Sequence, residues 1–254
     1  MTVSIITVTY NSANTIRDTL ESVKDQSYPH IEHIIIDGLS KDDTLRIVSE
    51  YPTVSRLISE PDKGIYDAMN KGIQIATGDI IGFLNSDDFF SKNDVIQTVV
   101  TNIKEKKVES VFGDVKFVDA KDIQKVVRYY SSQKFHPNRF AWGYMPAHPT
   151  FYTYKKNYEN FGIFKTDYKI CADYEILIRF LYSNKLSYAY IHQDLVTMRV
   201  GGVSNTNLKS RLILNKEIVR ACRENGIQTN LAKVCLKIFS KLSELIFIPK
   251  SVKN

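Results

Sequence analysis

The stretch VSIITVTYNS, residues 3–12, decides how the rest of the chain is interpreted. Residues 3–9 form an almost continuous apolar, β-branched run, which is typical of a parallel strand covered on both faces. Helical spacing follows over residues 16–23, and a second β-branched run over 31–36 leads into Asp37. This strand–helix–strand unit predicts a parallel sheet.

The same alternation continues to about residue 110 and predicts the fold class. It predicts a short helix after Asp43, strands over 56–59 and 80–84, and helices over 64–76 and 95–103. Beyond that point we expect a strand over 111–115, an irregular aromatic segment over 129–165, a helix over 173–182, a strand over 188–198, and helical stretches over 207–224 and 230–246. Strands joined by helices at this spacing indicate an α/β fold, with a Rossmann-like, mostly parallel central sheet flanked by helices and a C-terminal helical appendage.

The composition is that of an ordinary globular protein. Of the 254 residues, 43% are hydrophobic and 24% charged, and no apolar run reaches the roughly 18 residues of a membrane span. The N-terminus lacks the basic segment of a signal peptide, so we expect a cytoplasmic protein. Three cysteines at long spacing argue against a disulfide framework and a zinc site. Five lysines against one glutamate within residues 229–254 supply most of the formal net charge of +6.

Polar residues follow three of the predicted strands, at the edge where open parallel sheets bind ligands. They are Thr9, Tyr10 and Asn11 after the first strand, Asp37 after the second, and Asp87 and Asp88 after the fourth. The first turn has neither a GxGxxG nor a GxxxxGK[ST] sequence, so glycine amides do not provide a phosphate cradle. A divalent cation, Mg²⁺ or Mn²⁺, would neutralise a bound phosphate through oxygen ligands, and the two consecutive aspartates are the natural holder.

Three ordered motifs, VSIITVTYN at 3–11, DGLSKDDT at 37–44 and NSDD at 85–88, resemble those of family 2 glycosyltransferases. A fourth, SEPDKGIYDAMNKG at 59–72, is similar to members found in capsule and O-antigen synthesis. The resemblance covers roughly residues 1–205. It implies a GT-A catalytic domain over 1–205, with a nucleotide-sugar-binding half over 1–110 and an acceptor-binding half over 111–205, followed by a basic amphipathic extension over 206–254.

The resemblance also implies roles for single residues. Asp37 would face the nucleotide base, Asp87 would lie near the ribose and Asp88 would hold the metal, Mn²⁺ or Mg²⁺. Further donor contacts are implied for the residues of two motifs, namely Thr9, Tyr10, Asn11, Lys63, Asp67 and Asn70.

The segment CADYE, residues 171–175, resembles the family's (E/A)DY segment, whose aspartate is the general base. Asp173 would accept the proton of the acceptor hydroxyl as its oxygen attacks the anomeric carbon with inversion. His148 falls where related enzymes bring a histidine near the acceptor. Arg199, Gly201 and Gly202 resemble a loop that closes over the diphosphate.

Structural interpretations of the same residues stay open. Asp37 with the glycine after it could form a tight turn, the aspartates at 87 and 88 could cap the next helix, and Asp173 could be a helix N-terminal charge. His148 could be a packed loop residue. Several aromatic residues are expected in the core more often than on sugar rings: Phe135, Phe140, Trp142, Tyr144, Phe151, Tyr152 and Tyr154.

The C-terminal tail also has two interpretations. An apolar stripe of Leu231, Val234, Cys235, Ile238, Leu242 and Leu245 runs beside Lys233, Lys237 and Lys241. The pattern fits a helix of residues 229–254 lying on an anionic membrane surface, and it equally fits a helix docked on the catalytic domain with a solvated lysine face.

Together these features predict an inverting glycosyltransferase. It would move a hexose or N-acetylhexosamine from a UDP-sugar, the family's commonest donor type, to a lipid-linked or oligosaccharide acceptor in bacterial surface polysaccharide synthesis. A non-catalytic nucleotide- or carbohydrate-binding module is an alternative. A sugar nucleotidylyltransferase is another, although the glycine-rich first loop of that class is absent from residues 10–14. Nucleic-acid binding is not expected, because no recognised binding motif is present.

Overall fold

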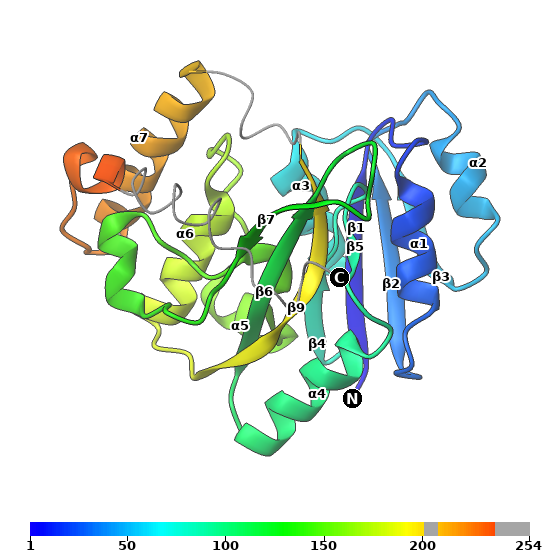
Figure 1. The fold of residues 1–254 in the computed structure, drawn as a ribbon, viewed down its shortest axis with the longest axis horizontal. Helices are drawn as coiled ribbons and strands as arrows, with labels where there is room; N and C mark the ends of the chain where they lie inside the picture. Colours follow the sequence, from blue (N-terminus) through cyan, green and yellow to red (C-terminus); the bar gives the residue numbers. More distant parts are fainter. Residues whose placement is uncertain (201–207, 237–254) are drawn as a thin grey trace.

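A computed structural model describes residues 1–200 and 208–236 of the chain (Figure 1). In these residues one mixed sheet runs in the order β3-β2-β1-β4-β8-β6-β9-β5, and β7 pairs with β6 at the side. The strands are β1 (Val3–Thr9), β2 (Ile31–Asp37), β3 (Val54–Ser59), β4 (Ile80–Phe83), β5 (Phe89–Phe90), β6 (Ser110–Val118), β7 (Val126–Tyr130), β8 (Tyr152–Tyr154) and β9 (Tyr188–Arg199). The predicted α/β class is confirmed.

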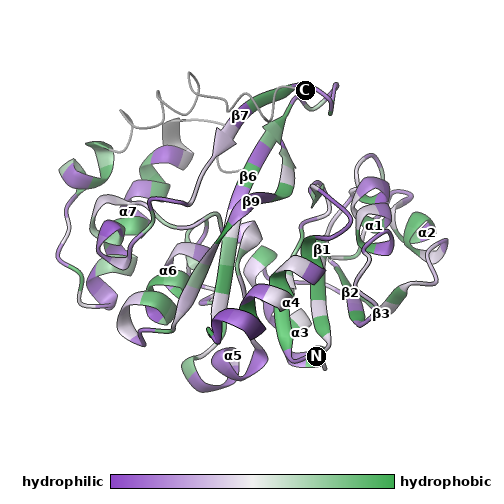
Figure 2. Cartoon of the chain, turned by 60° about the horizontal axis from the view of Figure 1, so that its bottom comes forward, coloured by the Kyte–Doolittle hydropathy of each residue, from purple (hydrophilic) through white to green (hydrophobic). Residues whose placement is uncertain are grey.

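Helices cover both faces of this sheet. They are α1 (Ile16–Lys24), α2 (Thr44–Ser49), α3 (Ile65–Ile75), α4 (Val95–Lys106), α5 (Lys155–Phe161), α6 (Ala172–Ile178) and α7 (Leu208–Glu224), with short 3₁₀ turns at Pro137–Trp142 and His148–Thr150 and a π-helical turn at Arg179–Ser183. One apolar core joins the sheet to α3, α6 and α7, and a second joins it to α4. In Figure 2 the fully buried strand β1 is largely green, β7 and β9 also carry purple segments, and the helices alternate green and purple, as expected of amphipathic helices.

The first half of the sheet is parallel, and its register aligns the predicted site residues. Strand β1 pairs with β2 and β4, and β2 pairs with β3, all in parallel. Thr9 lies opposite Asp37, which lies opposite Ser59, so the three strands end together at the upper edge in Figure 1. The loops that follow these strands therefore share one edge of the sheet.

The second half departs from the parallel pattern at β8. This strand pairs antiparallel with both β4 and β6, and so joins the two halves of the sheet. Gly82 of β4 lies against Tyr152 of β8, where an added Cβ would be only 2.1 Å from the ring. The segment 129–165, expected to be irregular, contains the end of β7, both 3₁₀ turns, β8 and α5, which are too short to show a full period in the sequence.

Most of the aromatic residues of that segment are core, as the sequence predicted. Phe140, Phe151 and Tyr152 are buried, and Phe135 packs against the same core as Phe140. Trp142 differs, because 43% of its surface is exposed.

Helix α7 packs on α6 and the second half of the sheet rather than standing apart from them. Its residues Ile218, Val219, Ala221 and Cys222 are buried in the core that also contains α6. Val234, in the next helical turns, is buried too, whereas Leu231 is exposed. Ile238, Leu242, Leu245, Lys237 and Lys241 lie outside the described residues, as does the predicted domain boundary at 205, so both the boundary and the tail's role stay predictions. In the part of the chain that the structure describes, no helix is long and apolar enough to cross a membrane.

Candidate functional site

The loops after β1 and β2 are joined to each other by hydrogen bonds. The Asn11 amide N–H donates to Ser40 Oγ at 2.8 Å, and the Lys41 N–H donates to Asn11 Oδ1 at 2.8 Å. Asn11 adopts a left-handed backbone with φ of 49°, which asparagine tolerates better than most residues. Tyr10 next to it is 59% exposed. The two loops thus form one wall, with a tyrosine ring available on its surface.

Asp37 holds this wall in place through hydrogen bonds to its carboxylate. It is fully buried at the end of β2, and its carboxylate accepts hydrogen bonds from the Ser40 N–H at 3.0 Å, from the Ser40 hydroxyl and from Ser59 Oγ at 2.6 Å. The turn-forming role considered for Asp37 is therefore present. Its contact with a nucleotide base stays a prediction, as do the donor contacts of Thr9, Tyr10 and Asn11.

Asp88 is the most unusual carboxylate at this edge. It is buried, its Oδ1 has no hydrogen-bond partner in the described residues, and the same holds for Oδ1 of Asn85. Burial, reinforced by the neighbouring Asp87 carboxylate, raises the pKa of Asp88 well above its usual range. The helix-capping alternative is wrong, since the N-cap of α4 is Asp94. Two inward oxygens without partners fit an oxygen-seeking divalent cation.

The backbone that carries the two aspartates is held by side chains from elsewhere. Thr19 of α1 donates to the Asp88 carbonyl at 2.6 Å, and Arg199 at the end of β9 donates to the Asp87 carbonyl at 2.6 Å. Arg199 also forms an ion pair with Asp18 and is only 9% exposed. The structure therefore gives Arg199 a supporting role at the aspartate loop, and its predicted diphosphate contact stays a prediction. Gly201 and Gly202 lie outside the described residues.

The structure brings together two residues that are far apart in the predicted acceptor half. His148 Nδ1 lies 3.2 Å from Asp173 Oδ2, and Asp173 Oδ1 accepts the Tyr174 N–H at 2.8 Å. Both side chains remain partly exposed, at 36% for His148 and 19% for Asp173. Asp173 does occupy the first turn of α6, as the structural alternative supposed, yet its second oxygen is directed by the histidine. A partly exposed carboxylate oriented by an imidazole suits proton transfer.

The fourth motif provides contacts between the halves. Asn70 is buried on α3, where its amide donates to the Phe164 carbonyl at 2.8 Å and its oxygen accepts the Phe164 N–H at 2.9 Å. These contacts give Asn70 a structural role, and its predicted donor contact stays a prediction. Asp67 accepts the backbone N–H of Lys63 at 3.0 Å, while the Lys63 residue is exposed. Donor contacts of Lys63 and Asp67 stay predictions.

Two supporting residues were not identified from the sequence. Tyr66 of α3 donates its hydroxyl to the Ile170 carbonyl, three residues before Asp173. Ser86 bonds Ser12 at 2.8 Å between the hydroxyls, and so connects the loop after β1 to the aspartate pair. Both residues stand inside motifs quoted above, but nothing in their spacing indicates a partner.

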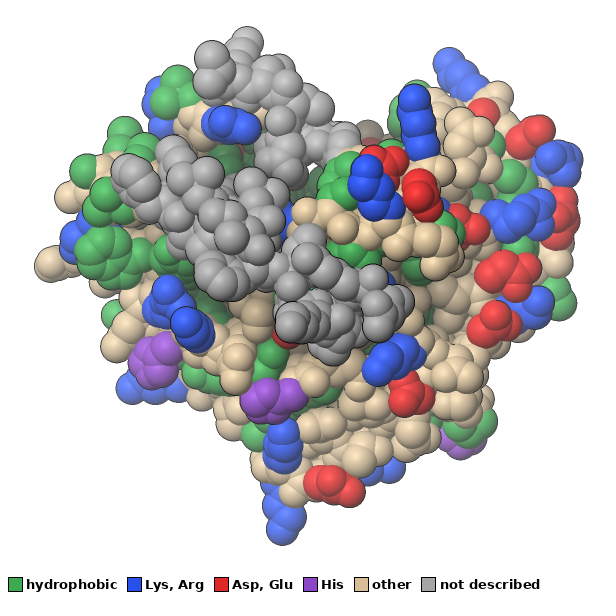
Figure 3. Space-filling model, in the orientation of Figure 1, with side chains coloured by type: hydrophobic (Ala, Val, Ile, Leu, Met, Phe, Trp, Pro, Cys, Tyr) green, Lys and Arg blue, Asp and Glu red, His purple; other side chains and the backbone are tan. Residues whose placement is uncertain are grey.

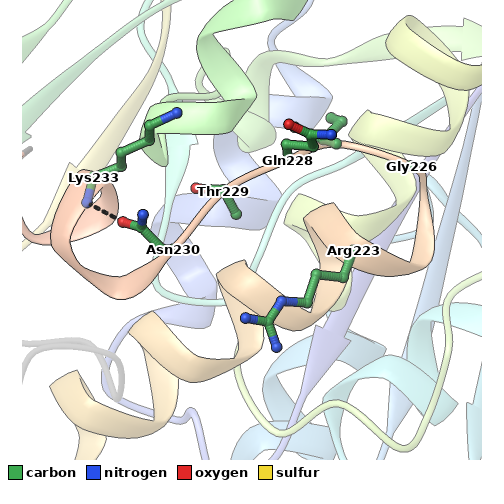
Figure 4. A pocket seen from close by; sticks show the side chains of 7 residues that line it. Arg223, Gly226, Gln228, Thr229, Asn230 and Lys233 are labelled. Carbon is green, nitrogen blue, oxygen red and sulfur yellow. Dashed lines mark hydrogen bonds between the residues drawn. The ribbon is translucent and has the colours of Figure 1, made fainter.

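A separate cavity of about 550 Å³ opens at the end of α7 (Figure 4). It is lined by Arg223, Gly226, Ile227, Gln228, Thr229, Asn230 and Lys233. None of these is a predicted site residue, and the cavity contains no carboxylate to serve as a base. Among residues 1–200 and 208–236, no group of three or more His, Cys, Asp or Glu side chains could hold a metal. The metal-holding role of Asp88 stays a prediction, and the observation beside it is the buried Oδ1 without a partner.

Known proteins resemble this chain in both sequence and fold. A family model described as Glycosyl transferase family 2 matches residues 4–169. An uncharacterised glycosyltransferase of Mycobacterium tuberculosis is 35% identical over 183 residues, which are 70% of this chain and 68% of the relative. A PGL/p-HBAD biosynthesis glycosyltransferase of Mycobacterium bovis is 29% identical over 223 residues, covering 85% and 82% of the two chains. The crystal structure of S. aureus TarS 1-349 in complex with UDP-GlcNAc superposes with a TM-score of 0.69 at 17% identity, over 94% of this chain and 73% of that one.

Proposed function

Because the chain belongs to glycosyltransferase family 2 and has its GT-A fold, we propose that it transfers a sugar from a UDP-sugar to a hydroxyl group of a saccharide acceptor, with inversion at the anomeric carbon. The observation that carries this proposal is the pairing of Asp173 with His148 across 25 residues of sequence. That pairing supports a base on the acceptor side, separate from the buried Asp88 on the donor side.

The proposed reaction needs one group that accepts the proton of the acceptor hydroxyl and one site that stabilises negative charge on the leaving diphosphate. The acceptor oxygen forms a bond to the anomeric carbon while the bond from that carbon to the diphosphate oxygen breaks. Asp173 takes the hydroxyl proton, and His148, in the tautomer that carries the proton on Nδ1, holds the carboxylate in the direction of attack. A single displacement needs no covalent enzyme intermediate, so no second carboxylate nucleophile is required.

Asp88 supports the proposal that a divalent cation accompanies the donor. Its Oδ1 is buried without a partner, and the Asn85 oxygen beside it is in the same state. When bound, Mn²⁺ or Mg²⁺ would stabilise the negative charge that develops on the leaving diphosphate. Asp87 would be left for the ribose, and the wall formed by the loops after β1 and β2 would hold the nucleoside.

The donor and acceptor classes follow from the relatives. The TarS structure contains UDP-GlcNAc, which supports a UDP-linked hexose or N-acetylhexosamine as donor. The mycobacterial relative is named for PGL/p-HBAD biosynthesis, which supports surface glycan synthesis on a lipid-linked acceptor. On the face drawn in Figure 3, most acidic side chains lie at the right, over α1 and α2, where basic ones are interspersed among them. The five lysines against one glutamate in residues 229–254 support peripheral contact of this segment with an anionic membrane.

Calorimetry tests the donor assignment directly. UDP, GDP, dTDP and NAD are titrated into the protein with Mn²⁺ and then with EDTA, and we expect UDP alone to bind, in a metal-dependent way. The Asp88→Asn variant, which keeps the size of the side chain, should lose the metal dependence. If no nucleoside diphosphate binds under either condition, the chain is a non-catalytic module.

The tail is tested separately by comparing binding to vesicles of phosphatidylglycerol before and after deletion of 229–254.

A further inference from the structure

The carboxylate of Glu217 on α7 accepts three consecutive backbone N–H groups of the segment that precedes α6. Oε1 accepts the N–H of Lys169 at 2.8 Å, and Oε2 accepts those of Ile170 at 2.9 Å and Cys171 at 3.0 Å. Hydrogen bonds to an ionised acceptor are roughly twice as strong as neutral ones. One side chain therefore fixes the path of three residues that belong to no helix or strand.

Glu217 is a firm anchor because its helix is firmly packed. The next residues, Ile218 and Val219, are buried, and so are Ala221 and Cys222 one turn further on. All four belong to the core that contains Tyr174 of α6. Helices α6 and α7 lie side by side at the left of Figure 1. The carboxylate thus projects from a fixed helix onto the segment 169–171.

Two further contacts hold the same segment, one from α3 and one from α7. The Tyr66 hydroxyl of α3 donates to the Ile170 carbonyl, and Cys171 Sγ lies 3.5 Å from the Leu214 carbonyl of α7. Asp173 follows Cys171 by two residues, and its carboxylate meets His148. A shift of 169–171 would turn the start of α6 and alter the direction of the Asp173 carboxylate.

We propose that Glu217 is a positioning residue for the transfer reaction, which holds Asp173 against His148 through the backbone of 169–171. The inference rests on the proposed function, in which Asp173 is the base. Glu217 lies outside residues 4–169, which match the family model, so the helix after the matched region contributes to catalysis in this chain.

The test is the Glu217→Gln variant. The substitution removes the negative charge of the carboxylate and replaces one acceptor oxygen with an NH₂ group, which cannot accept hydrogen bonds from the backbone N–H groups of 169–171. The substrate is whichever of UDP-GlcNAc, UDP-glucose, UDP-galactose and GDP-mannose the wild type hydrolyses, with water as acceptor. We expect kcat to fall about 10- to 100-fold, because small misplacements of a reacting group cost rates of that order, while donor KM changes less than about twofold. Amide hydrogen exchange at Lys169, Ile170 and Cys171 should accelerate in the same variant.

Glu224→Gln is the matched control. Glu224 is also on α7, but it accepts from the side chains of Lys165, Tyr168 and Arg220 and from no backbone amide of 169–171. It should lower the melting temperature without the loss of kcat. Equal kcat losses in the two variants, or unchanged kcat or amide exchange in Glu217→Gln, would overturn the inference. The Asp173→Asn variant distinguishes failure of the proposed function from failure of this inference. If Asp173→Asn retains turnover, the assignment of Asp173 as the base is wrong. If Asp173→Asn is inactive while Glu217→Gln is fully active, only the role of Glu217 is refuted.

Discussion

The two halves of the sheet build their parts of the site in different ways. Strands β1 to β4, within residues 1–83, are parallel to one another, and the side chains that shape the site lie at the ends of these strands or in the loops that follow them, as Asp37 and Ser40 do. In residues 110–236 the sheet is mixed, Asp173 meets His148, and the segment just before Asp173 is held by contacts from α3 and α7. The first half is specified by contiguous motifs, and the second is assembled from distant segments.

The largest effect we expect is the loss of turnover in Asp173→Asn. Asparagine keeps the shape of the side chain but cannot take the proton, and general-base catalysis is worth about 10²- to 10⁴-fold. UDP affinity should stay within about twofold, because the proposed donor residues lie in the other half. Donor hydrolysis and nucleotide calorimetry measure the two quantities on one preparation.

Asp167→Asn provides the control for that variant. Asp167 is a nearby exposed carboxylate that pairs with Arg220, so its loss removes a charge without touching His148. It should leave turnover within about twofold, as expected of an exposed ion pair. If both variants retain turnover, the base is another residue, and the second half can no longer be described as the half that provides the base.

The second prediction concerns the strand that joins the halves. Gly82→Ala places a methyl group 2.1 Å from the Tyr152 ring, which is fully buried and cannot move aside. Overpacking of this kind costs about 1–3 kcal/mol, so we expect a marked fall in the free energy of unfolding measured in urea.

A second substitution at the junction decides whether the clash is the cause. Tyr152→Leu makes room for the methyl group, so the Gly82→Ala/Tyr152→Leu protein should be more stable than the sum of the single changes predicts. Additive losses would show that the glycine matters for another reason, such as backbone freedom in β4.

The third prediction uses pH to destabilise the protein through a buried group of the first half. His33 of β2 is fully buried, and burial lowers its pKa from 6.5 to about 3. The unfolded chain therefore takes up a proton below pH 6.5 that the folded chain refuses until about pH 3. Stability is full above pH 6.5 and falls as the pH drops, by about 2 kcal/mol at pH 5. Urea unfolding at pH 7 and pH 5 measures it.

His33→Gln tests the assignment, since glutamine can still bond the Thr7 hydroxyl, which lies 3.1 Å from His33 Nε2. The variant should lose most of the difference in stability between pH 7 and pH 5, whatever its absolute stability. An unchanged difference would mean that another group takes up the proton.

The sequence was sufficient for the first half because its signals are local. An apolar run of seven residues predicts β1, and a polar residue at its end predicts a ligand edge. Asp88 could be selected as a metal candidate for the same reason, and its buried oxygen without a partner is consistent with that selection. Even there, the support that Arg199 gives to the aspartate loop was invisible, because 111 residues separate Arg199 from Asp88.

The second half could not be derived to the same degree. Asp173 and His148 were selected from a resemblance, but their contact depends on how 3₁₀ turns and short strands fold back, and these elements lack periodicity. Asn70 shows that a motif residue can also have a structural contact. It stands in a motif associated with donor binding, yet both ends of its amide bond the Phe164 backbone 94 residues away. A motif shows that a residue matters without showing which partner it serves.

The smallest effect concerns acid stability of the second half. Burial opposes ionisation of Glu224, but hydrogen bonds from Lys165, Arg220 and Tyr168 outweigh it and lower its pKa to about 2. Because the unfolded value is 4.5, this group stabilises the protein above about pH 4.5, and the stabilisation is lost as the pH falls toward 2. The side chain is 32% exposed, so solvent and salt should hold the contribution below about 1 kcal/mol. In Glu224→Gln, the free energy of unfolding should fall slightly less between pH 4.5 and 2.5 than in the wild type. Addition of 1 M NaCl should have the same effect on the wild type. A loss of stability as steep as that caused by His33 would mean that the ion pairs of Glu224 are better shielded from solvent than their exposure indicates.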